Sequence, residues 1–575
     1  MISKINILFL DNRIKSILLL LSCLCIFALI SPIEVGYIII SVILAFLTYI
    51  CIVNLYSKIN MVNIQKATIL LLSIFISYIE SSLFFERGIK SNKALMASRL
   101  LKIRLDFLLN IIRYLLMVLS LYAIFYILSI IVDIVLSIIK KVNVSLLLSY
   151  FTNHSFLEYV SHFIKSVLIV AFSSIVATSV LFFTYKYKGK EVDLNVSKSA
   201  YLIKDEGVSP SLFGYCQSQL DNFTDSIMLL EAGNDSNNSI INRAMLVYRD
   251  TLPNKNPYEV LIEKYIHNKQ SFSTMTYSRY WHGYLSILIP LLSFMNYLDI
   301  RTANAITQTL FAIIFAALLY KKKLKHLIIP YVLSILMMCL PAIANCLQFS
   351  SCYYIMTIGS LIILISDDLN IKPNYIFLFI GICVAFFDFL TYPIATFGFP
   401  MIIYLSCNEE KKLEDKLFCL VKCGVFWLFG YGLMWFSKWV IASLTTDEKA
   451  ISYAFKAFAY RTSNTSPEGH RHSVLYVIYN NVLAFFKTPF TIAVLIFILI
   501  IIVKIYKNES FDKIKKASLL YYFAPYGILA ILPILWYCFA TDHSAMHYWF
   551  TNKSLIVSLF SILVFLVNLE KKSNY

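Results

Sequence analysis

Apolar runs of about 20 residues, the length of a membrane-spanning helix, recur along the whole chain and limit its fold more than any other feature. Three examples are the stretches at 171–185, 491–506 and 554–569. Irregular backbone cannot face lipid, because its N–H and C=O groups would find no hydrogen-bond partner there. The sequence therefore predicts an all-α polytopic membrane protein.

The whole chain has a net charge of +17, and in its second half lysine-rich segments join the apolar runs. Cytoplasmic loops of membrane proteins carry such an excess of Lys and Arg. We therefore place these joints in the cytoplasm and expect no nucleic-acid partner. The joints are KKKLKH (321–326), NEEKKLEDK (408–416), KIYKNESFDKIKK (504–516) and EKKSNY (570–575).

With the joints inside, the apolar runs alternate without conflict, and we expect about 14 transmembrane helices. Nine spans are expected in the second half, at 303–320, 327–345, 353–366, 374–391, 393–406, 417–444, 489–505, 518–538 and 553–568. Five precede them, at 15–34, 35–55, 67–84, 107–138 and 163–185. The segments expected outside are 186–302, 445–488 and 541–553.

The segment 283–300 is apolar, but counting it as a crossing would put the joint at 321–326 outside. It is short and contains Pro290, and charged residues bracket it. We expect a juxtamembrane helix that lies along the outer surface with its apolar side toward the lipid.

We divide the chain into an N-terminal membrane module of about four helices at 1–160 and a core at 161–575 that includes the long outer loop 186–302. Within the module, the segment 86–104 carries six basic residues and one acid, yet this topology places it outside. Either the segment folds back as an amphipathic element, or one of the five N-terminal spans does not cross.

Two aspartates stand four residues apart in DNFTDSIMLLEAG (221–233), within the outer loop. A structural role is a serious alternative for each one. Asp221 would cap a helix that begins at Asn222, and Asp225 would lie in the first turn of that helix, where a negative charge is favourable.

The other conspicuous polar motifs fall on the same expected side. They are YSRYWHGY (277–284), FFDFLTYP (386–393), EGHRHS (468–473) and DHSAMHYWF (542–550). The first motif also fits an interfacial aromatic belt, and the third fits solvated surface. The two histidines of the last motif have the i, i+4 spacing of zinc ligands, but no third ligand stands nearby and we expect no metal site there.

As a set, these blocks resemble bacterial integral membrane glycosyltransferases of the GT-C superfamily. The resemblance covers about 186–575 and rests on DNFTD, RYWHGY, DFLTYP and the HSAMHYWFT block. It implies a GT-C-like core, a polyprenyl-phosphate-linked sugar as donor, and an envelope glycan or lipid as acceptor. It also implies a bacterial plasma (inner) membrane enzyme whose active face is outside.

Such a transfer needs an acid or base near the acceptor hydroxyl and cations that hold the phosphate. The resemblance and this chemistry make Asp221 and Asp225 the catalytic candidates, with Asp221 favoured. A divalent cation (Mg²⁺ or Mn²⁺) on either carboxylate is compatible with the sequence but not required by it. The substrate-binding candidates are Arg279, Trp281, His282, Asp388, His470, Arg471, His472, His543 and His547.

Two other classes of function stay open at this point. A flippase, transporter or polymerase-like protein that handles lipid-linked envelope sugars would share the basic outer face. Ionisable residues near the bilayer midplane would favour it, and the spans carry few of them. A membrane scaffold without chemistry would leave the outer polar residues unexplained.

Overall fold

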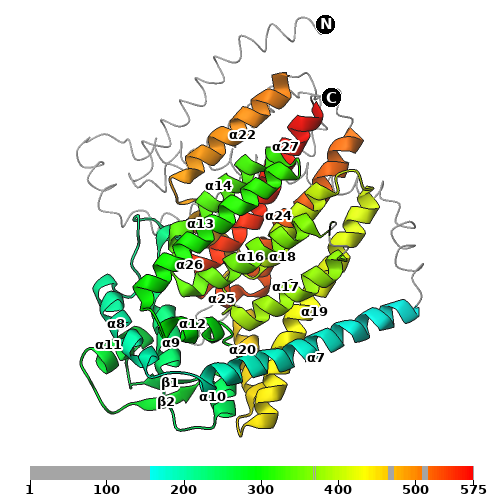
Figure 1. Cartoon of the computed structure of the whole chain (residues 1–575). Helices are drawn as coiled ribbons and strands as arrows, with labels where there is room; N and C mark the ends of the chain where they lie inside the picture. Colours follow the sequence, from blue (N-terminus) through cyan, green and yellow to red (C-terminus); the bar gives the residue numbers. More distant parts are fainter. Residues whose placement is uncertain (1–155, 367, 369–370, 464–471, 508–515, 574–575) are drawn as a thin grey trace, which may run out of the picture. The chain divides into compact units, whose positions relative to one another are not determined.

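The computed structural model describes residues 156–366, 368, 371–463, 472–507 and 516–573. Residues 1–155 of the predicted N-terminal module lie outside this part of the chain, so the division at 160/161 stays a prediction. The described part is mostly helical (Figure 1).

Five helical stretches are long and apolar enough to cross a membrane, at Leu157–Lys186, Tyr297–Lys321, Leu347–Ile365, Leu413–Thr445 and Tyr548–Lys571. They contain the helices α7 (Phe156–Lys186), α13 (Tyr297–Lys321), α16 (Leu347–Ile365), α19 (Leu413–Thr445), α26 (Tyr548–Thr551) and α27 (Ile556–Ser573). A sixth span arises if α21 (Val474–Phe486) and α22 (Phe490–Lys507), which meet at 89°, count together. The described chain is therefore that of a multi-pass membrane protein.

Further apolar helices are shorter than a full span or are described only in part. They are α14 (Ile328–Met338), α15 (Leu340–Ala344), α17 (Pro373–Phe387), α18 (Ile394–Cys407) and α24 (Lys516–Phe539), whose described apolar part is Ala524–Phe539. The predicted span at 327–345 is broken at Cys339, which takes a left-handed conformation (φ 58°) between α14 and α15. The count of about 14 spans stays a prediction.

The outer loop 186–302 folds into short helices and one small sheet. Its helices are α8 (Glu191–Glu206), α9 (Asn222–Gly233), α10 (Ile240–Leu246), α11 (Pro257–Tyr265) and α12 (Leu285–Leu292). Strands β1 (Tyr248–Thr251) and β2 (Ser273–Thr276) pair antiparallel, with Tyr248 opposite Thr276. At about 1.5 Å per residue, α12 is too short to cross a bilayer, and the last residues of the segment 283–300 already belong to α13.

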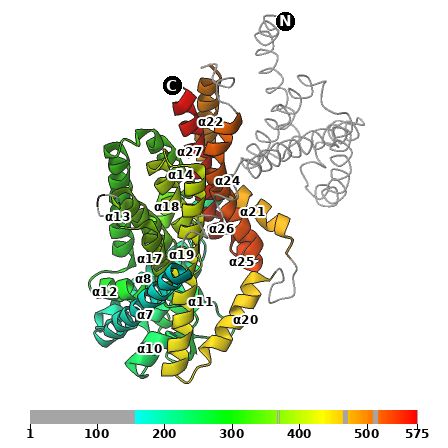
Figure 2. The same cartoon turned by 90° about the vertical axis from the view of Figure 1, so that its right-hand side faces the viewer.

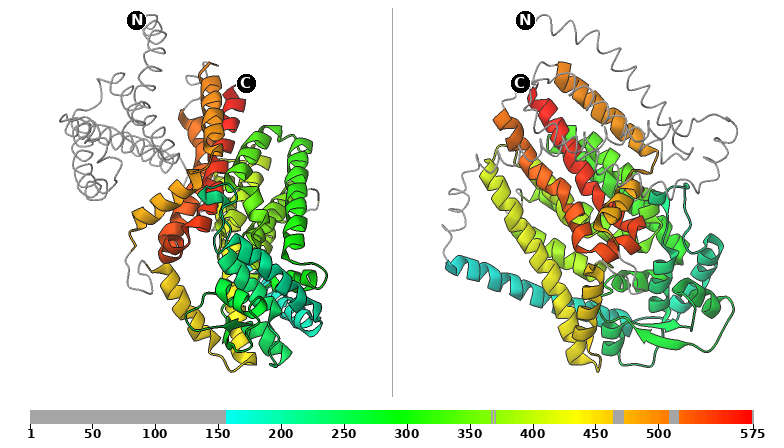
Figure 3. Two further views of the ribbon diagram at one scale, coloured as in Figure 1. Left: turned by 90° about the vertical axis from the view of Figure 1, so that its left-hand side faces the viewer. Right: turned by 180° about the vertical axis from the view of Figure 1, so that it is seen from behind.

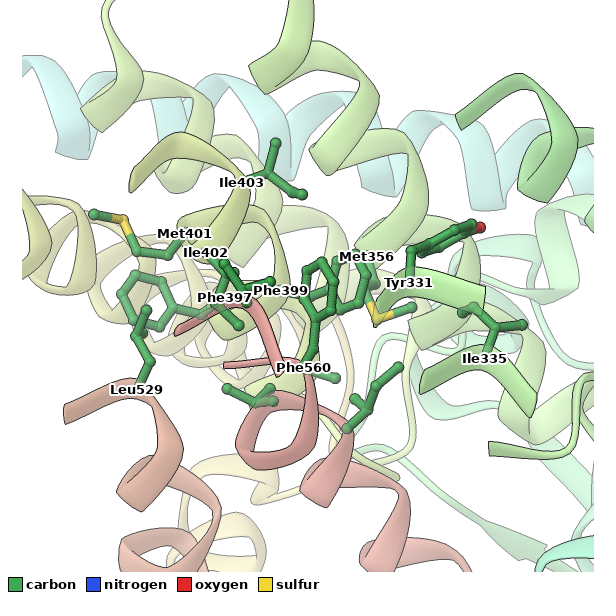
Figure 4. Packing of buried hydrophobic residues seen from close by; sticks show 14 of the residues in the cluster. Tyr331, Ile335, Met356, Phe397, Phe399, Met401, Ile402, Ile403, Leu529 and Phe560 are labelled. Atoms are coloured by element: carbon green, nitrogen blue, oxygen red, sulfur yellow. The ribbon is translucent and has the colours of Figure 1, made fainter. Parts of the chain in front are cut away.

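The main apolar core lies between α13, α14, α16, α18, α24 and α27 (Figure 4). Phe399 of α18 stacks on Phe560 of α27 with ring centroids 4.3 Å apart, and Tyr331 of α14 packs against Phe399. A second core joins α7 and α19 to the helices of the outer loop. The outer loop therefore rests on the spans through buried apolar side chains.

Helices α17 and α19 approach so closely that glycines are required at the contact. A Cβ on Gly381 would lie 2.2 Å from the carbonyl oxygen of Trp427, and a Cβ on Gly430 would lie 2.1 Å from that of Leu378. Small residues that let backbones approach are a common packing device of membrane helices.

Three of the four lysine-rich joints meet at one end of the helices. His326 Nε2 lies 3.9 Å from a carboxylate oxygen of Glu409, and Lys571 Nζ lies 3.4 Å from the other oxygen. This end is opposite the sheet of β1 and β2, as the course of the red helix α27 shows in three views (Figures 1, 2 and 3). These three joints thus share one end of the helices, as the positive-inside argument predicts.

Candidate functional site

The loop between α17 and α18 is fixed by Asp388, which follows the last residue of α17. The Asp388 carboxylate accepts a hydrogen bond from the backbone N–H of Thr391 (2.9 Å) and another from the Thr391 hydroxyl. Aspartate and threonine commonly hold tight turns in this way. Leu390 takes a positive φ of 68°, and its carbonyl accepts a hydrogen bond from His543 Nε2 (2.7 Å).

An arginine from another segment binds both histidines of the HSAMH motif. Arg461 lies in the last turn of α20 (Ala450–Thr462), and His543 lies in α25 (Thr541–Met546). Arg461 Nη1 donates to His543 Nδ1 (2.8 Å) and to His547 Nε2 (3.0 Å). Both imidazoles therefore accept from a cation and are neutral.

The surroundings keep these histidines uncharged. Burial, His547 and Arg461 all hold the pKa of His543 well below its usual value. Burial and then Arg461 lower the pKa of His547 to about 3. Across the accessible pH range, the charge of this group is that of the guanidinium alone.

The Asp542 carboxylate interacts with the charge of Arg461 through space but makes no hydrogen bond with it. No Asp or Glu of the described residues forms an ion pair with it, and its Nε and Nη2 donate no hydrogen bond within the described part of the chain. Arg461 was not among the predicted site residues. The only local sign of it in the sequence is that a basic residue ends a helix within the segment 445–488.

Asp542 lies beside this group, in the first turn of α25. Its Oδ1 is 3.8 Å from Nε2 of His472. Both atoms are buried and have no hydrogen-bond partner. Burial raises the pKa of Asp542, while Arg461 and His472 oppose that shift. Asp542 begins the motif DHSAMHYWF (542–550), but the sequence did not indicate it as a site residue.

Arg279 is held among tyrosines rather than acids. Its Nη1 donates to the hydroxyl of Tyr453 in α20 (2.9 Å), and its Nη2 donates to that of Tyr277 (3.1 Å). The guanidinium also lies 5.4 Å from the ring centre of Tyr280. Trp281 is fully buried and donates from Nε1 to the carbonyl of Met434 (2.7 Å), so its indole packs within the protein.

His282 belongs to a buried network with Glu231, a residue of α9. His282 Nδ1 lies 3.2 Å from Glu231 Oε2, and the Tyr284 hydroxyl donates to the same carboxylate oxygen. His282 Nε2 contacts the carbonyl of Tyr277 (2.7 Å). Glu231 was not predicted, although a glutamate within the apolar run SIMLLEAG was a visible signal.

Asp221 is the N-cap of α9, which begins at Asn222, so the capping alternative is confirmed for this residue. Its two oxygens accept from the backbone N–H and from the hydroxyl of Thr224, both at 3.0 Å. The Trp549 side chain is a further hydrogen-bond partner of this carboxyl. Burial raises the pKa of Asp221, against the effect of these bonds.

Asp225 is fully buried and sits at the N-terminus of α16. Its carboxylate accepts from the backbone N–H groups of Leu347 and Gln348, each at 3.3 Å, and from the Tyr297 hydroxyl. Burial raises its pKa to about 6, while Arg301 opposes the shift. A helix N-terminus favours a carboxylate, so Asp225 binds three segments together.

Protein donors thus occupy the carboxylate oxygens of Asp221 and Asp225, and this arrangement does not fit a divalent cation. Within the residues that the structure describes, no three His, Cys, Asp or Glu side chains gather as a metal site would require.

Five predicted site residues are linked by contacts into one layer, namely Asp221, His282, Asp388, His543 and His547. Trp549 contacts both Asp221 and His547, and the loop at Asp388 contacts both His543 and, through Phe389, the ring of His282 (5.0 Å). His470 and Arg471 lie outside the described residues. Comparisons with protein-family models, curated proteins and solved structures find no match to this chain.

Proposed function

We propose that this chain is a membrane glycosyltransferase that moves a sugar from a polyprenyl-phosphate-linked donor to an envelope glycan or lipid acceptor. The observation that carries the proposal is Arg461, whose guanidinium donates to two neutral histidines and forms no ion pair with a carboxylate of the described residues. Guanidinium groups suit phosphate oxygens because they donate paired hydrogen bonds.

In this proposal Arg461 binds the donor phosphate and stabilises the negative charge that grows on it as the sugar leaves. His543 and His547 orient the guanidinium, because each accepts a hydrogen bond from Nη1. Arg279 adds positive charge nearby, since it lowers the pKa of His543 through space. A carboxylate of the same layer serves as base, and no step requires a metal ion.

The enzyme would lie in a bacterial inner membrane, with this layer at the outer face and about 14 spans. Support for the orientation comes from the lysine-rich joints, which lie at the opposite end of the helices. A flippase or transporter for the same lipid is the alternative. It would bind the phosphate equally well but would leave the bond between sugar and phosphate intact.

Replacing Arg461 by Gln tests the proposal. We expect kcat/KM for transfer from a panel of polyprenyl-phosphate hexoses to fall about 10- to 100-fold, because one charged hydrogen-bond donor to phosphate is lost. Transfer of radiolabelled sugar by purified protein in liposomes, with envelope lipid or glycan as acceptor, is the measurement. Polyprenyl phosphate without sugar serves as the probe of binding.

Arg243→Gln is the matched control, since Arg243 of the outer loop lies 3.6 Å from the Asp235 carboxylate and is expected to keep parental activity. If the parental protein binds polyprenyl phosphate but breaks no sugar–phosphate bond with any donor of the panel, the chain is a transporter or flippase and the proposal is wrong.

A further inference from the structure

Three buried polar atoms around Arg461 lack any hydrogen-bond partner. They are Oδ1 of Asp542, Nε2 of His472 and Nδ1 of His547. A buried polar atom without a partner costs about 1–3 kcal/mol, so native proteins rarely tolerate several in one place. Their occurrence beside a guanidinium that forms no ion pair in the described part of the chain points to a bound polar group.

The spacing of two of these atoms indicates the chemistry of that group. Asp542 Oδ1 and His472 Nε2 are 3.8 Å apart, and one oxygen atom between them would be within hydrogen-bond reach of both. A hydroxyl donates one hydrogen bond and accepts others. It can therefore donate to the carboxylate while it accepts from an imidazole N–H, as a sugar or lipid hydroxyl would.

Asp221 and Asp225, which the sequence favoured as catalytic residues, have no carboxylate oxygen that is without a hydrogen-bond donor. The oxygens of Asp221 already accept from Thr224, and those of Asp225 accept from Tyr297 and from two backbone N–H groups. A carboxylate whose oxygens are occupied is a poor proton acceptor until those bonds break. Asp542 keeps Oδ1 without a donor, beside the histidine that binds Arg461. Glu231 also keeps Oε1 without a donor, but its other oxygen accepts from Tyr284 and lies beside His282.

We propose that Asp542 is the catalytic base that receives the proton of the acceptor hydroxyl, an inference that rests on the proposed glycosyl transfer. The O–H bond of the acceptor breaks and its proton passes to Asp542 Oδ1. The acceptor oxygen forms a bond to the anomeric carbon of the sugar. The bond from that carbon to the phosphate oxygen breaks, and polyprenyl phosphate leaves with the electron pair toward Arg461.

A backbone hydrogen bond holds Asp542 close to the end of α20, where Arg461 lies. The N–H of Asp542 donates to the carbonyl of Ser463 at 3.0 Å, and the next residue, His543, binds Arg461. Base and phosphate-binding cation are thus neighbours on α20 and α25, which pack together. Burial raises the pKa of Asp542, which makes its carboxylate a stronger base near neutral pH.

Asp542→Asn tests the inference in the transfer assay described above. We expect kcat to fall about 100-fold or more, because general-base catalysis contributes at least that much, while KM for the donor stays within about 2-fold. The unchanged donor KM also shows that the variant folds. Asp542→Glu should restore part of the rate. Asp235→Asn, which alters an exposed outer-loop carboxylate, is the matched control and should keep the parental rate.

Asp221→Asn, measured in parallel, separates the two candidate carboxylates. A loss that is larger for Asp221→Asn than for Asp542→Asn overturns the inference and supports Asp221, while glycosyl transfer itself stands. A near-parental kcat for Asp542→Asn also overturns it. If the parental protein transfers no sugar, the proposed function fails, and this inference fails with it.

Discussion

Asp225 shows how a single buried carboxylate ties distant parts of this chain together. Its partners Leu347 and Gln348 lie 122 and 123 residues away, and Tyr297 lies 72 residues away. The cap made by Asp221 is local, because its donor Thr224 follows three residues later. Capping by Asp221 was therefore visible in the sequence, whereas the role of Asp225 depends on tertiary contacts that no local pattern reports.

The raised pKa of Asp225 has a consequence for stability. Burial raises it from 3.8 to about 6 in the folded chain, so between these values the folded state binds more protons than the unfolded state. Stability from this group is therefore present at pH 4 and is lost as the pH rises toward 6. A difference of this size corresponds to about 3 kcal/mol at most.

Asp225→Asn should remove that pH dependence, since the amide oxygen still accepts a backbone hydrogen bond but does not titrate. The thermal unfolding midpoint of purified protein in detergent, recorded from pH 4 to pH 6, is the measurement. We expect a steeper decline for the parental protein than for the variant. Parallel curves would show that Asp225 is not protonated in this range.

At the scale of helices, apolar length predicted the five long apolar helices of the described residues but not how helices begin or break. The span expected at 303–320 begins already at Tyr297, because Asn296 and Asp299 form a capping box there. The sheet of β1 and β2 was missed, since its four-residue strands are too short and too exposed to show an alternating pattern. The sequence placed the polar motifs on one side of the membrane, but it did not indicate Arg461 or Glu231 as site residues.

The glycine contact between α17 and α19 makes a sharp prediction about helix packing. Gly430→Val should destabilise the protein by about 1–3 kcal/mol or more, because the new side chain would collide with the backbone of Leu378. Gly432→Val is the matched control on the same helix, since no atom lies within 4 Å of a Cβ placed there.

The thermal unfolding midpoints of the two glycine variants in the same detergent provide the comparison. We expect a clear drop for Gly430→Val and a small change for Gly432→Val, which tests helix propensity alone. Equal changes in both variants would mean that close contact of α17 and α19 does not limit stability.

At the scale of the whole molecule, the transmembrane topology decides which residues lie on the same side of the membrane. The four joints were assigned to one side from their lysines alone, and the contacts of Glu409 with His326 and Lys571 bring three of them together. The sequence could predict the succession of apolar segments because hydropathy is a local property of the chain. It could not predict which of the segments between them are in contact, because Arg461 and His543 are 82 residues apart.

Two lysine-to-cysteine variants test the sidedness. Lys412 lies in a joint, Lys255 lies in the outer loop, and both are exposed. In intact cells, a membrane-impermeant maleimide should label Lys255→Cys above the background of the parental chain and leave Lys412→Cys unlabelled until the cells are opened. Labelling of Lys412→Cys from outside would overturn the topology and the side assigned to the site.

Helix α19 carries a continuous row of neighbouring aromatic rings, of which Trp427 and Tyr431 are stacked and the others are tilted. The ring centroids of Trp427 and Tyr431 are 5.1 Å apart, those of Tyr431 and Trp435 are 5.3 Å apart, and those of Trp435 and Trp439 are 6.2 Å apart. Tyr280 meets this row at Trp435. Near-ultraviolet circular dichroism reports fixed aromatic packing. Because three of the six tryptophans stand in this row, the unlabelled protein carries an optical reporter of the packing between α19 and the segment 186–302.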